Sequence, residues 1–360
     1  MSELVRAALA RIVEGGTLSM DEARGAMGAV MDGEATSAQL AALLMGLRMR
    51  GETVEELAGF AAAMRERVVR VEAPAGAIDV VGTGGDGSGT FNISTTAALV
   101  VASAGVPVAK HGNRAITSRA GSADVLDALG IRIDHDAPSA SAALRENGFA
   151  FMFAPGFHPA MRHAGPTRRE IGVWTAFNLL GPLTNPAGTR RQLLGVGDPA
   201  AASRIADVAR LLGTERTFVI HGAGVDELPL DGSGVLYDVS PEGIERRTVD
   251  AAALGLRRAP TSRLAGGSPE ENARMIESIL RGEPGVRRDV VVLNAGAAFL
   301  VAGAVESLDD GIDRAALAID AGLGTELLER LRAERRAAEA AAAAATEAQA
   351  SAPDAAGTSA

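Results

Sequence analysis

The segment DVVGTGGDGSGTFNIST, residues 79–95, is the most informative part of the sequence about the fold. A short apolar run from Ile78 to Val81, in which Asp79 is the exception, leads into a cluster of glycines, and a helical pattern begins at Asn92. A strand, a glycine loop and a helix in this order are typical of α/β proteins. Glycines let backbone N–H groups approach an anion closely, and the start of a helix adds its dipole. The stretch therefore predicts a phosphate-binding loop, with a plain glycine turn as the simpler interpretation.

Side chains in and after this loop offer further hydrogen-bond donors: Ser88, Thr90, Asn92, Ser94 and Thr95. Asp86 lies inside the loop and would repel a bare phosphate unless it holds a hydroxyl group, a backbone amide or a hydrated metal. The spacing Gly82-x-Gly84-x-x-Gly87 formally matches the fingerprint of NAD-binding folds. That fingerprint expects an acidic residue at the end of the next strand, where this chain has Lys110. A Walker loop is excluded because no Gly-Lys-Ser/Thr follows the glycines.

The chain as a whole divides into a helical part before this loop and an α/β part that contains it. Helical patterns fill residues 1–73, and after Pro74 short strand-like runs alternate with helical ones. The strand-like runs are residues 78–81, 106–109, 149–153, 193–196, 217–220 and 290–293. We expect a small all-helical N-terminal domain, on which residues 165–193 pack. We also expect a larger α/β domain, formed by 74–164 and 194–332, with a central and mostly parallel sheet.

Composition limits the class of protein. The chain has 360 residues, 47% of them hydrophobic, which is enough for two domains. Its 35 basic and 45 acidic residues give a net charge of -10, which disfavours nucleic-acid and membrane partners because both are negatively charged. It has no cysteine and no run of about 18 apolar residues, and residues 1–16 do not have the pattern expected of a signal peptide. We therefore expect a cytoplasmic protein without disulfides. Residues 333–360 are rich in alanine and are expected to be a disordered tail, the first part of which could extend a helix.

A second group of polar residues follows the second predicted strand, in KHGNRAITSRAGSAD, residues 110–124. Ligands of open α/β sheets bind beyond the carboxyl ends of the strands, where both this segment and the glycine loop lie. Lys110, Arg114 and Arg119, together with several hydroxyl groups, predict a second anion site. A solvated basic loop is the alternative.

Two further pairs of charged residues are candidates for a site. Asp226 and Glu227 follow a strand-like run that ends in glycines, and they could hold hydrated Mg²⁺ ions or form a surface acidic pair. Arg168 and Arg169 fall in the first turns of a helix that Pro166 begins. An arginine fork can bind a carboxylate with two hydrogen bonds, but a basic helix face gives the same pattern. The five histidines show no zinc-binding spacing.

Together these segments resemble the anthranilate phosphoribosyltransferase family. The resemblance rests on the glycine loop, the 110–124 segment, FNLLGPLTNP at 177–186 and the Asp226-Glu227 pair, and it covers roughly residues 3 to 332. It implies a fold like that of the pyrimidine nucleoside phosphorylases. It also implies transfer of the phosphoribosyl group of phosphoribosyl pyrophosphate to the amine of anthranilate, a step of tryptophan biosynthesis. The family implies two Mg²⁺ ions and a homodimer.

The resemblance also implies roles for individual residues. Phosphoribosyl pyrophosphate is expected to contact Gly82, Thr83, Gly84, Gly85, Asp86, Thr90, Asn92, Ser94, Thr95, Lys110 and Ser122. Anthranilate is expected to contact Gly82, His111, Asn113 and Arg168. The metal ligands are expected to be Ser94, Asp226 and Glu227. Lys110 and Arg168 are the expected catalytic residues, with Arg169 as the alternative to Arg168. Trp174 departs from the family pattern and is interpreted as a packing residue.

Three other functions stay open at this point. A pyrimidine nucleoside phosphorylase of the same fold would cleave nucleosides with phosphate and without a metal; Asp86, the 177–186 segment and the Asp226-Glu227 pair disfavour it. A noncatalytic relative that binds nucleic acid is disfavoured by the net charge of -10. An NAD-dependent dehydrogenase is disfavoured by Lys110.

Overall fold

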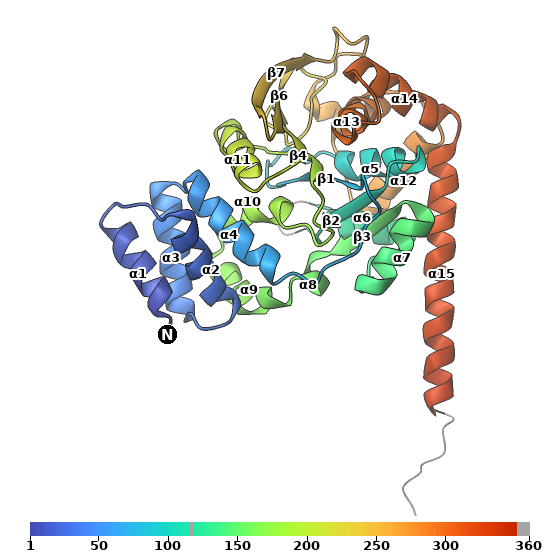
Figure 1. Ribbon diagram of the computed structural model, residues 1–360. Helices are drawn as coiled ribbons and strands as arrows, with labels where there is room; N and C mark the ends of the chain where they lie inside the picture. Colours follow the sequence, from blue (N-terminus) through green and yellow to red (C-terminus); the bar gives the residue numbers. More distant parts are fainter. Residues whose placement is uncertain (116–118, 351–360) are drawn as a thin grey trace, which may run out of the picture.

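The computed structural model describes residues 1–115 and 119–350 of the chain. Four N-terminal helices form a bundle beside a larger α/β part (Figure 1). Ile116, Thr117 and Ser118 of the second polar loop, and residues 351–360 of the expected tail, lie outside the described residues. None of the helices in the described ranges is both long and apolar enough to cross a membrane.

Capping motifs set where three helices of the bundle begin. Ser19, Thr36 and Thr53 each accept a hydrogen bond from the backbone N–H three residues later, and the side chain of that later residue accepts one from the N-cap N–H. Each such cap stabilises its helix by about 1 kcal/mol, because it pairs otherwise unsatisfied donors. The bundle helices are α1 (Glu3–Val13), α2 (Met20–Met31), α3 (Ser37–Arg50) and α4 (Val54–Glu66).

The α/β part is built on a seven-stranded sheet with the order β3-β2-β1-β4-β5-β6-β7. The first five strands in this order are parallel, and β6 and β7 add an antiparallel hairpin at one edge. The mostly parallel sheet predicted from the sequence is confirmed. The strands are β1 (Ile78–Gly82), β2 (Val108–Gly112), β3 (Phe149–Phe153), β4 (Arg191–Gly195), β5 (Arg216–Gly222), β6 (Ser233–Ser240) and β7 (Gly243–Asp250).

Helices cover both faces of the sheet. The longer ones are α5 (Ile93–Ser103), α7 (Ala137–Asn147), α11 (Pro199–Leu211), α12 (Pro269–Leu280), α13 (Val286–Ala302), α14 (Leu308–Asp320) and α15 (Leu323–Ala350). The shorter α-helices are α6 (Ser122–Ala128), α8 (Ala154–Phe157), α9 (Gly165–Ile171) and α10 (Ala176–Leu180). Three 3₁₀ turns complete the elements: η1 (Pro159–His163), η2 (Gly181–Leu183) and η3 (Thr261–Leu264).

Neighbouring residues of one strand enter different hydrophobic cores. Leu193 of β4 packs in the core formed with α5 and α13, whereas Leu194 packs in the core shared with α11 and the helical bundle. This separation follows from the alternation of side chains along a strand. The bundle and the sheet are therefore joined by a common core on one face of the sheet.

The segment 165–193 packs on the helical bundle although it is distant from it in the sequence. Helix α9 contacts α3, and α10 contacts both α3 and α4. Ala164, Ala176, Phe177 and Leu180 belong to the bundle core. The chain therefore crosses between the bundle and the sheet more than once.

Two sequence-based predictions differ from the structure. The run 290–293, predicted as a strand, lies in α13. This helix is buried on nearly all sides, and an apolar run alone does not distinguish a buried helix from a buried strand. Residues 333–350 belong to the segment expected as a disordered tail whose first part could extend a helix, and all of them continue α15, because alanine, glutamate and arginine are strong helix formers. The β6–β7 hairpin was not predicted.

Candidate active site

The candidate site lies at the carboxyl ends of the parallel strands. Strand β1 has β2 and β3 on one side and β4 and β5 on the other, so the strand order reverses at β1. Open α/β sheets bind ligands at such a switch point. The glycine loop follows β1, the second polar loop follows β2, and Asp226-Glu227 follow β5. The three predicted segments therefore follow the carboxyl ends of strands in one sheet and lie at the same end of it.

The path of the glycine loop requires glycine. Left-handed φ angles occur at Gly84 (63°), Gly85 (69°), Gly87 (71°) and Gly89 (65°). Residues that carry a Cβ are strained in this region of conformational space. At Gly82 the constraint is space, because a Cβ there would lie 2.2 Å from Asp226 Oδ2. The loop is therefore shaped to bring its backbone against the Asp226 carboxylate.

Asp86 is tied into the site by hydrogen bonds. Its Oδ1 accepts hydrogen bonds from the Ser88 N–H at 3.0 Å and from the Ser88 hydroxyl at 2.9 Å. Its Oδ2 accepts one from the Asp226 N–H at 3.3 Å. The sequence analysis expected a hydroxyl group, a backbone amide or a hydrated metal beside this carboxylate, and Asp86 contacts one hydroxyl group and two backbone amides.

The Asp226-Glu227 pair belongs to the site and is not a surface pair. Asp226 Oδ2 accepts a hydrogen bond from the Gly84 N–H at 2.8 Å, and Glu227 Oε1 accepts one from the Ser94 N–H at 3.0 Å. Burial and the adjacent Asp226 raise the pKa of Glu227 well above its ordinary value. Burial and the nearby Asp86 also raise the pKa of Asp226. Carboxylates crowded in this way favour a bound cation, because a cation relieves their repulsion.

Lys110 is a buried cation at the end of β2. It is 2% exposed, and its Nζ donates a hydrogen bond to the Val80 carbonyl at 2.5 Å. Asp79 lies on the adjacent strand and accepts hydrogen bonds from Asn185 Nδ2 at 2.7 Å and from the His111 N–H at 3.4 Å. Burial raises the pKa of Asp79 to about 6, and the Lys110 charge opposes that rise. This network fixes the lysine beneath the loops.

The other residues predicted for phosphoribosyl pyrophosphate lie mainly at helix starts. Asn92 precedes α5, where its Nδ2 donates to the Ala120 carbonyl at 3.2 Å and its Oδ1 accepts from Asn272 Nδ2 at 3.0 Å. Ser122 begins α6, and its hydroxyl donates to the Asn113 carbonyl at 3.3 Å. Half-buried positions are taken by Thr83, Thr90 and Ser94. Thr95 differs from them because it is enclosed in α5 and only 1% exposed.

Two of the residues predicted for anthranilate differ in their surroundings. His111 is buried, with its Nδ1 3.2 Å from the Gly181 carbonyl and its ring centre 5.0 Å from that of His158. Burial lowers the pKa of His111 to about 3 and that of His158 to about 4, so both rings are neutral at pH 7. Asn113 is exposed, and its Oδ1 accepts a hydrogen bond from the Arg114 N–H at 2.8 Å.

Arg168 and Arg169 lie in α9, which has Pro166 in its first turn as predicted. Arg168 is half-buried, with its guanidinium 4.7 Å from the ring centre of Phe177, whereas Arg169 is exposed. Burial lowers the pKa of Arg168. Within the described part of the chain, Arg168 forms no ion pair. A partly desolvated guanidinium of this kind is suited to a ligand carboxylate.

Trp174 lies against the glycine loop. Nothing in the sequence indicated this contact. A Cβ on Gly85 would lie 2.0 Å from Cζ3 of the indole. The same side chain packs on the core of the helical bundle, in agreement with its interpretation as a packing residue. The segment 165–193 therefore touches the loop that follows β1.

The donor set near the glycine loop fits magnesium shared with a ligand. No group of three or more His, Cys, Asp or Glu side chains in residues 1–115 and 119–350 forms a metal cage by itself. The carboxylates of Asp226 and Glu227 and the hydroxyl of Ser94 supply oxygen atoms. Mg²⁺ prefers oxygen ligands and usually completes its coordination with water and substrate phosphates.

Some residues of the site were missed by sequence reasoning. Asn185 and His158 contact Asp79 and His111, and Asn272 contacts Asn92. Asn185 lies in the segment that carried the resemblance, so a signal existed. For His158 and Asn272 the sequence has no recognisable motif, because the residues that they contact are distant in the sequence.

The two parts of the chain each match a known protein family model. Residues 6–68 match the family model described as "Glycosyl transferase family, helical bundle domain", and residues 75–325 match "Glycosyl transferase family, a/b domain". The two matches correspond to the helical bundle and the α/β part of the structure. The chain thus has the two-domain architecture of this glycosyl transferase class.

The chain is also similar, over most of its length, to individual enzymes of known name. The anthranilate phosphoribosyltransferase of Thermomicrobium roseum is 51% identical over 335 residues, which are 91% of this chain and 96% of the relative. That of Azorhizobium caulinodans is 48% identical over 330 residues, with coverage of 91% and 96%. The crystal structure of the Thermus thermophilus enzyme has a TM-score of 0.87 at 45% identity and covers 93% of this chain and 100% of that one. The Saccharomyces cerevisiae enzyme in complex with PRPP and Mg has a TM-score of 0.85 at 26% identity, with coverage of 93% and 99%. The chain therefore belongs to the anthranilate phosphoribosyltransferase family.

Proposed function

We propose that this chain transfers the phosphoribosyl group of phosphoribosyl pyrophosphate to the amine of anthranilate, giving N-(5-phosphoribosyl)anthranilate and pyrophosphate. The observation that carries the proposal is the contact between the glycine loop and the carboxylate pair. The Gly84 N–H bonds to Asp226, and the Ser94 N–H at the start of α5 bonds to Glu227. A loop suited to phosphates and carboxylates suited to Mg²⁺ thus share one site.

The phosphoribosyl donor occupies the glycine loop and the helix starts. Its proposed contacts are Gly82, Thr83, Gly84, Gly85, Asp86, Thr90, Asn92, Ser94, Thr95, Lys110 and Ser122. In the reaction, the bond from C1 of the ribose to pyrophosphate breaks and negative charge grows on the leaving group. Backbone N–H groups of the loop and the Lys110 charge stabilise that growing charge, because they are already oriented before the reaction.

Ser94, Asp226 and Glu227 are the residues proposed to hold Mg²⁺, and two ions are the number that we propose. When bound, magnesium would neutralise oxygens of the pyrophosphate. The raised pKa values of Asp226 and Glu227 support a cation at this place. The yeast relative in complex with PRPP and Mg supports the same choice of metal.

Anthranilate is held by its carboxylate on Arg168, with contacts to Gly82, His111 and Asn113. Arg168 and Lys110 are the proposed catalytic residues. Arg168 would orient the amine toward C1, and the buried charge of Lys110 lies beneath the loops that would hold the leaving group. The aryl amine is neutral at pH 7, so it attacks C1 without prior deprotonation, and we assign no strong general base. The yeast relative has also been solved with 4-fluoroanthranilate.

A homodimer in the cytoplasm is part of the same proposal. Large apolar side chains are exposed on the helical bundle, among them Leu4 (56%) and Val13 (83%) on α1 and Met49 (84%) on α3. Exposed apolar residues on neighbouring helices favour association between copies. Sedimentation equilibrium of the wild type and of Val13→Glu would test this arrangement, and a monomeric wild type would contradict it.

The function is tested by a fluorescence assay of the purified protein with anthranilate, phosphoribosyl pyrophosphate and Mg²⁺. We expect a loss of anthranilate fluorescence that requires both the donor and the metal and that stops when EDTA is added. No loss with folded protein would overturn the assigned reaction. Pyrimidine nucleosides with phosphate would then be the next substrates to test.

A further inference from the structure

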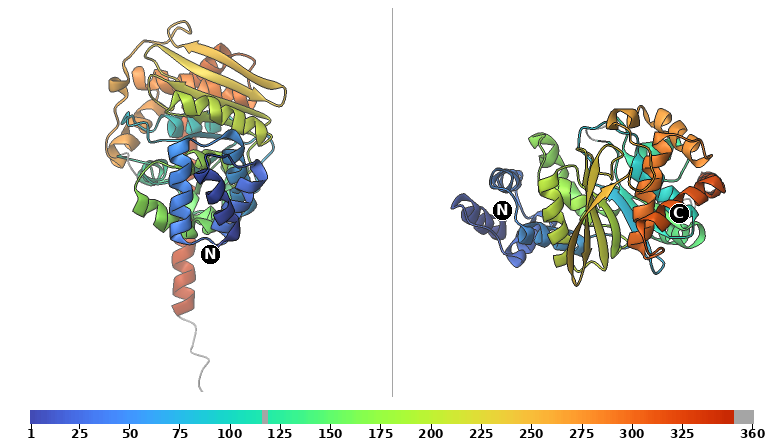
Figure 2. Two further views of the ribbon diagram at one scale, coloured as in Figure 1. Left: turned by 90° about the vertical axis from the view of Figure 1, so that its left-hand side faces the viewer. Right: turned by 90° about the horizontal axis from the view of Figure 1, so that it is seen from above.

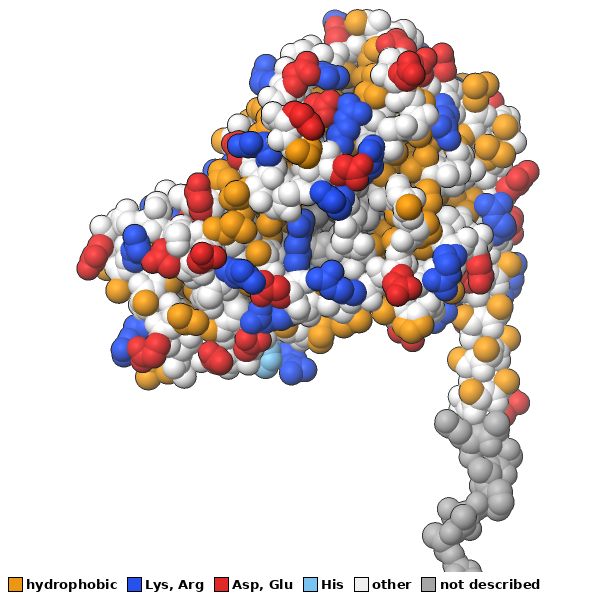
Figure 3. All heavy atoms as spheres, viewed as in Figure 1, with side chains coloured by type: hydrophobic (Ala, Val, Ile, Leu, Met, Phe, Trp, Pro, Cys, Tyr) orange, Lys and Arg blue, Asp and Glu red, His pale blue; other side chains and the backbone are white. Residues whose placement is uncertain are grey.

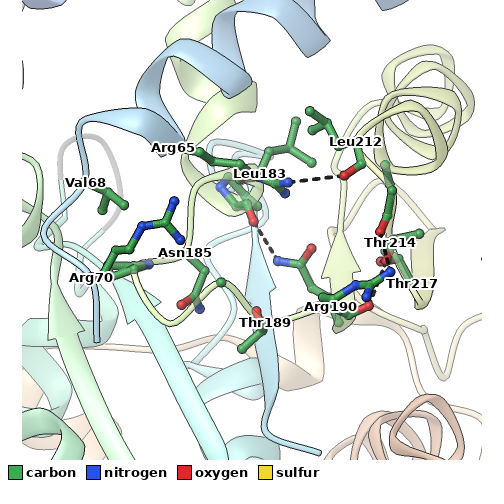
Figure 4. Close-up of a pocket in the computed structure, with 16 residues that line it drawn as sticks. Arg65, Val68, Arg70, Leu183, Asn185, Thr189, Arg190, Leu212, Thr214 and Thr217 are labelled. Atoms are coloured by element: carbon green, nitrogen blue, oxygen red, sulfur yellow. Dashed lines mark hydrogen bonds between the residues drawn. The ribbon is translucent and has the colours of Figure 1, made fainter. Parts of the chain in front are cut away.

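A cavity of about 280 Å³ lies near the amino ends of β4 and β5 (Figure 4). The glycine loop, by contrast, follows the carboxyl end of β1. The walls of the cavity come from three places: the end of α4 and the chain after it, the turn from 182 to 190, and the end of α11 with the chain to 217. The first two are the connections between the helical bundle and the α/β domain. The cavity therefore lies at the hinge between the two domains, and we call it the hinge cavity.

The charges that line the hinge cavity are all positive. Arg65, Arg70 and Arg190 line it, and none of the other lining residues is charged. In Figure 4, Arg70 and Arg190 lie on opposite sides of the cavity, with Arg65 above them. Figure 3 looks onto this face, where basic side chains surround a hollow between the two domains.

These arginines have no acidic partner in the described part of the chain. Most arginines nearby do: Arg191 pairs with Glu215 at 2.5 Å, and Arg216 with Asp238 at 2.8 Å. The hinge cavity therefore keeps three positive charges that the protein itself does not neutralise.

Arg65 is the most enclosed of the three. It is half-buried, its Nε donates to the Leu183 carbonyl at 2.6 Å, and its Nη1 lies 3.5 Å from the Leu212 carbonyl. Burial lowers the pKa of this guanidinium. Carbonyl oxygens pair its N–H groups but leave its charge unbalanced, and a buried charge without a counter-ion is costly.

We propose that the hinge cavity is a second binding site for a phosphate group, or for an oxyanion of the same shape such as sulfate, which contacts Arg65, Arg70 and Arg190. Arginine guanidinium groups match the geometry of phosphate oxygens. The volume of about 280 Å³ suits inorganic phosphate or a small phosphate ester. A phosphate bound here would contact both connections between the domains, through Arg65 and Arg70 on one and Arg190 on the other.

The test is calorimetric titration of inorganic phosphate and of methyl phosphate into the full chain without Mg²⁺. The variant is Arg70→Gln/Arg190→Gln, which changes two exposed side chains and leaves Arg65 in place. The control is Arg336→Gln, an exposed arginine of α15 that forms no ion pair in the described residues. We expect the double variant to lose one binding event or to weaken it at least about tenfold, because hydrogen bonds to charged groups are strong. The control should match the wild type.

The two probes separate the possible sources of the phosphate group. Tighter binding of methyl phosphate would indicate a phosphate ester, and tighter binding of inorganic phosphate would indicate the free ion. Equal binding by the wild type and the double variant, or no binding of either probe, would overturn the proposal. Binding is measured without turnover, so the outcome is independent of the proposed reaction.

Discussion

The two ends of the parallel strands carry opposite charges. At the carboxyl ends, Asp86, Asp226 and Glu227 crowd around the glycine loop, and two of these carboxyl groups have raised pKa values. At the amino ends, the hinge cavity has arginines and no carboxylate in its walls. Strand β4 connects both ends, and its five residues span roughly 16 Å. An acidic site accepts a polyphosphate only together with a cation, whereas a basic site accepts an anion alone.

The largest effect is expected from neutralising the acidic end. Asp226→Asn keeps the size of the side chain but removes its charge, so the metal and the pyrophosphate are both held less well. We expect kcat/KM to fall by about 100-fold or more, as for other groups that stabilise a developing charge. The decrease in kcat/KM is measured from initial rates at saturating Mg²⁺. Asp231→Asn, at an exposed position nearby, is the control and should keep the wild-type rate. A normal rate for Asp226→Asn would refute the metal assignment.

Arg168 resembles Arg65 of the hinge cavity, because both are half-buried arginines without an ion pair in the described residues. Arg168→Gln should raise the KM for anthranilate roughly 10- to 100-fold, because a charge-assisted hydrogen bond is lost. The KM for phosphoribosyl pyrophosphate should change little. Arg169→Gln is the matched control on the same helix. Equal increases in both KM values would show that Arg168 does not select anthranilate.

The contact between Trp174 and the loop is tested by two alanine substitutions. Gly85→Ala and Gly87→Ala impose similar backbone strain, with φ of 69° and 71°, but only the first meets Trp174. We expect Gly85→Ala to lower the free energy of unfolding by about 1–3 kcal/mol more than Gly87→Ala does. Adding Trp174→Ala should reduce that difference. Chemical denaturation provides the measurement, and identical losses for the two glycines would show that Trp174 does not constrain the loop at Gly85.

The smallest effect is a difference in pH dependence between the two ends. Asp226 and Glu227 have raised pKa values, so they take up protons at a higher pH than ordinary carboxylates, and Mg²⁺ must displace those protons. The Mg²⁺ concentration for half-maximal rate should rise by about two- to tenfold as the pH falls from 8 to 6, because protons then compete with the metal for these carboxylates. Sulfate binding to the hinge cavity should stay constant, because guanidinium groups keep their charge. A constant Mg²⁺ requirement would contradict the carboxylate assignment.

The sequence predicts the parts of the fold that have local signals. The glycine loop is flanked by its strand and helix within 17 residues, and the start of α2 is marked by its own capping residues. Residues 290–293 have no such local mark, because α13 is buried on nearly all sides and its apolar run fits either structure. Helix α15 is longer than expected because the helix propensity of its residues outweighs their low complexity.

In the candidate site, too, residues with local sequence signals were predicted and residues without such signals were not. Asp86 and the Asp226-Glu227 pair were found because their neighbours in the sequence indicate what they do. The Asp79–Asn185 contact joins residues 106 positions apart, and no spacing within one segment reveals it. Trp174 was identified as a packing residue, but its contact with Gly85 depends on how the 165–193 segment returns to the sheet.

Helix α15 extends beyond the body of the protein, away from the N-terminal helices (Figure 2). At about 1.5 Å per residue, its 28 residues measure roughly 42 Å. Its contacts with α5, α12 and α14 fix it to the α/β domain, so it acts as a lever arm for that domain. Because the chain has no cysteine, thiols introduced at Ala344 and Ala7 would be the only sites for a pair of dyes. A rotation of a few degrees between the domains would then be read as a change in energy transfer between the dyes.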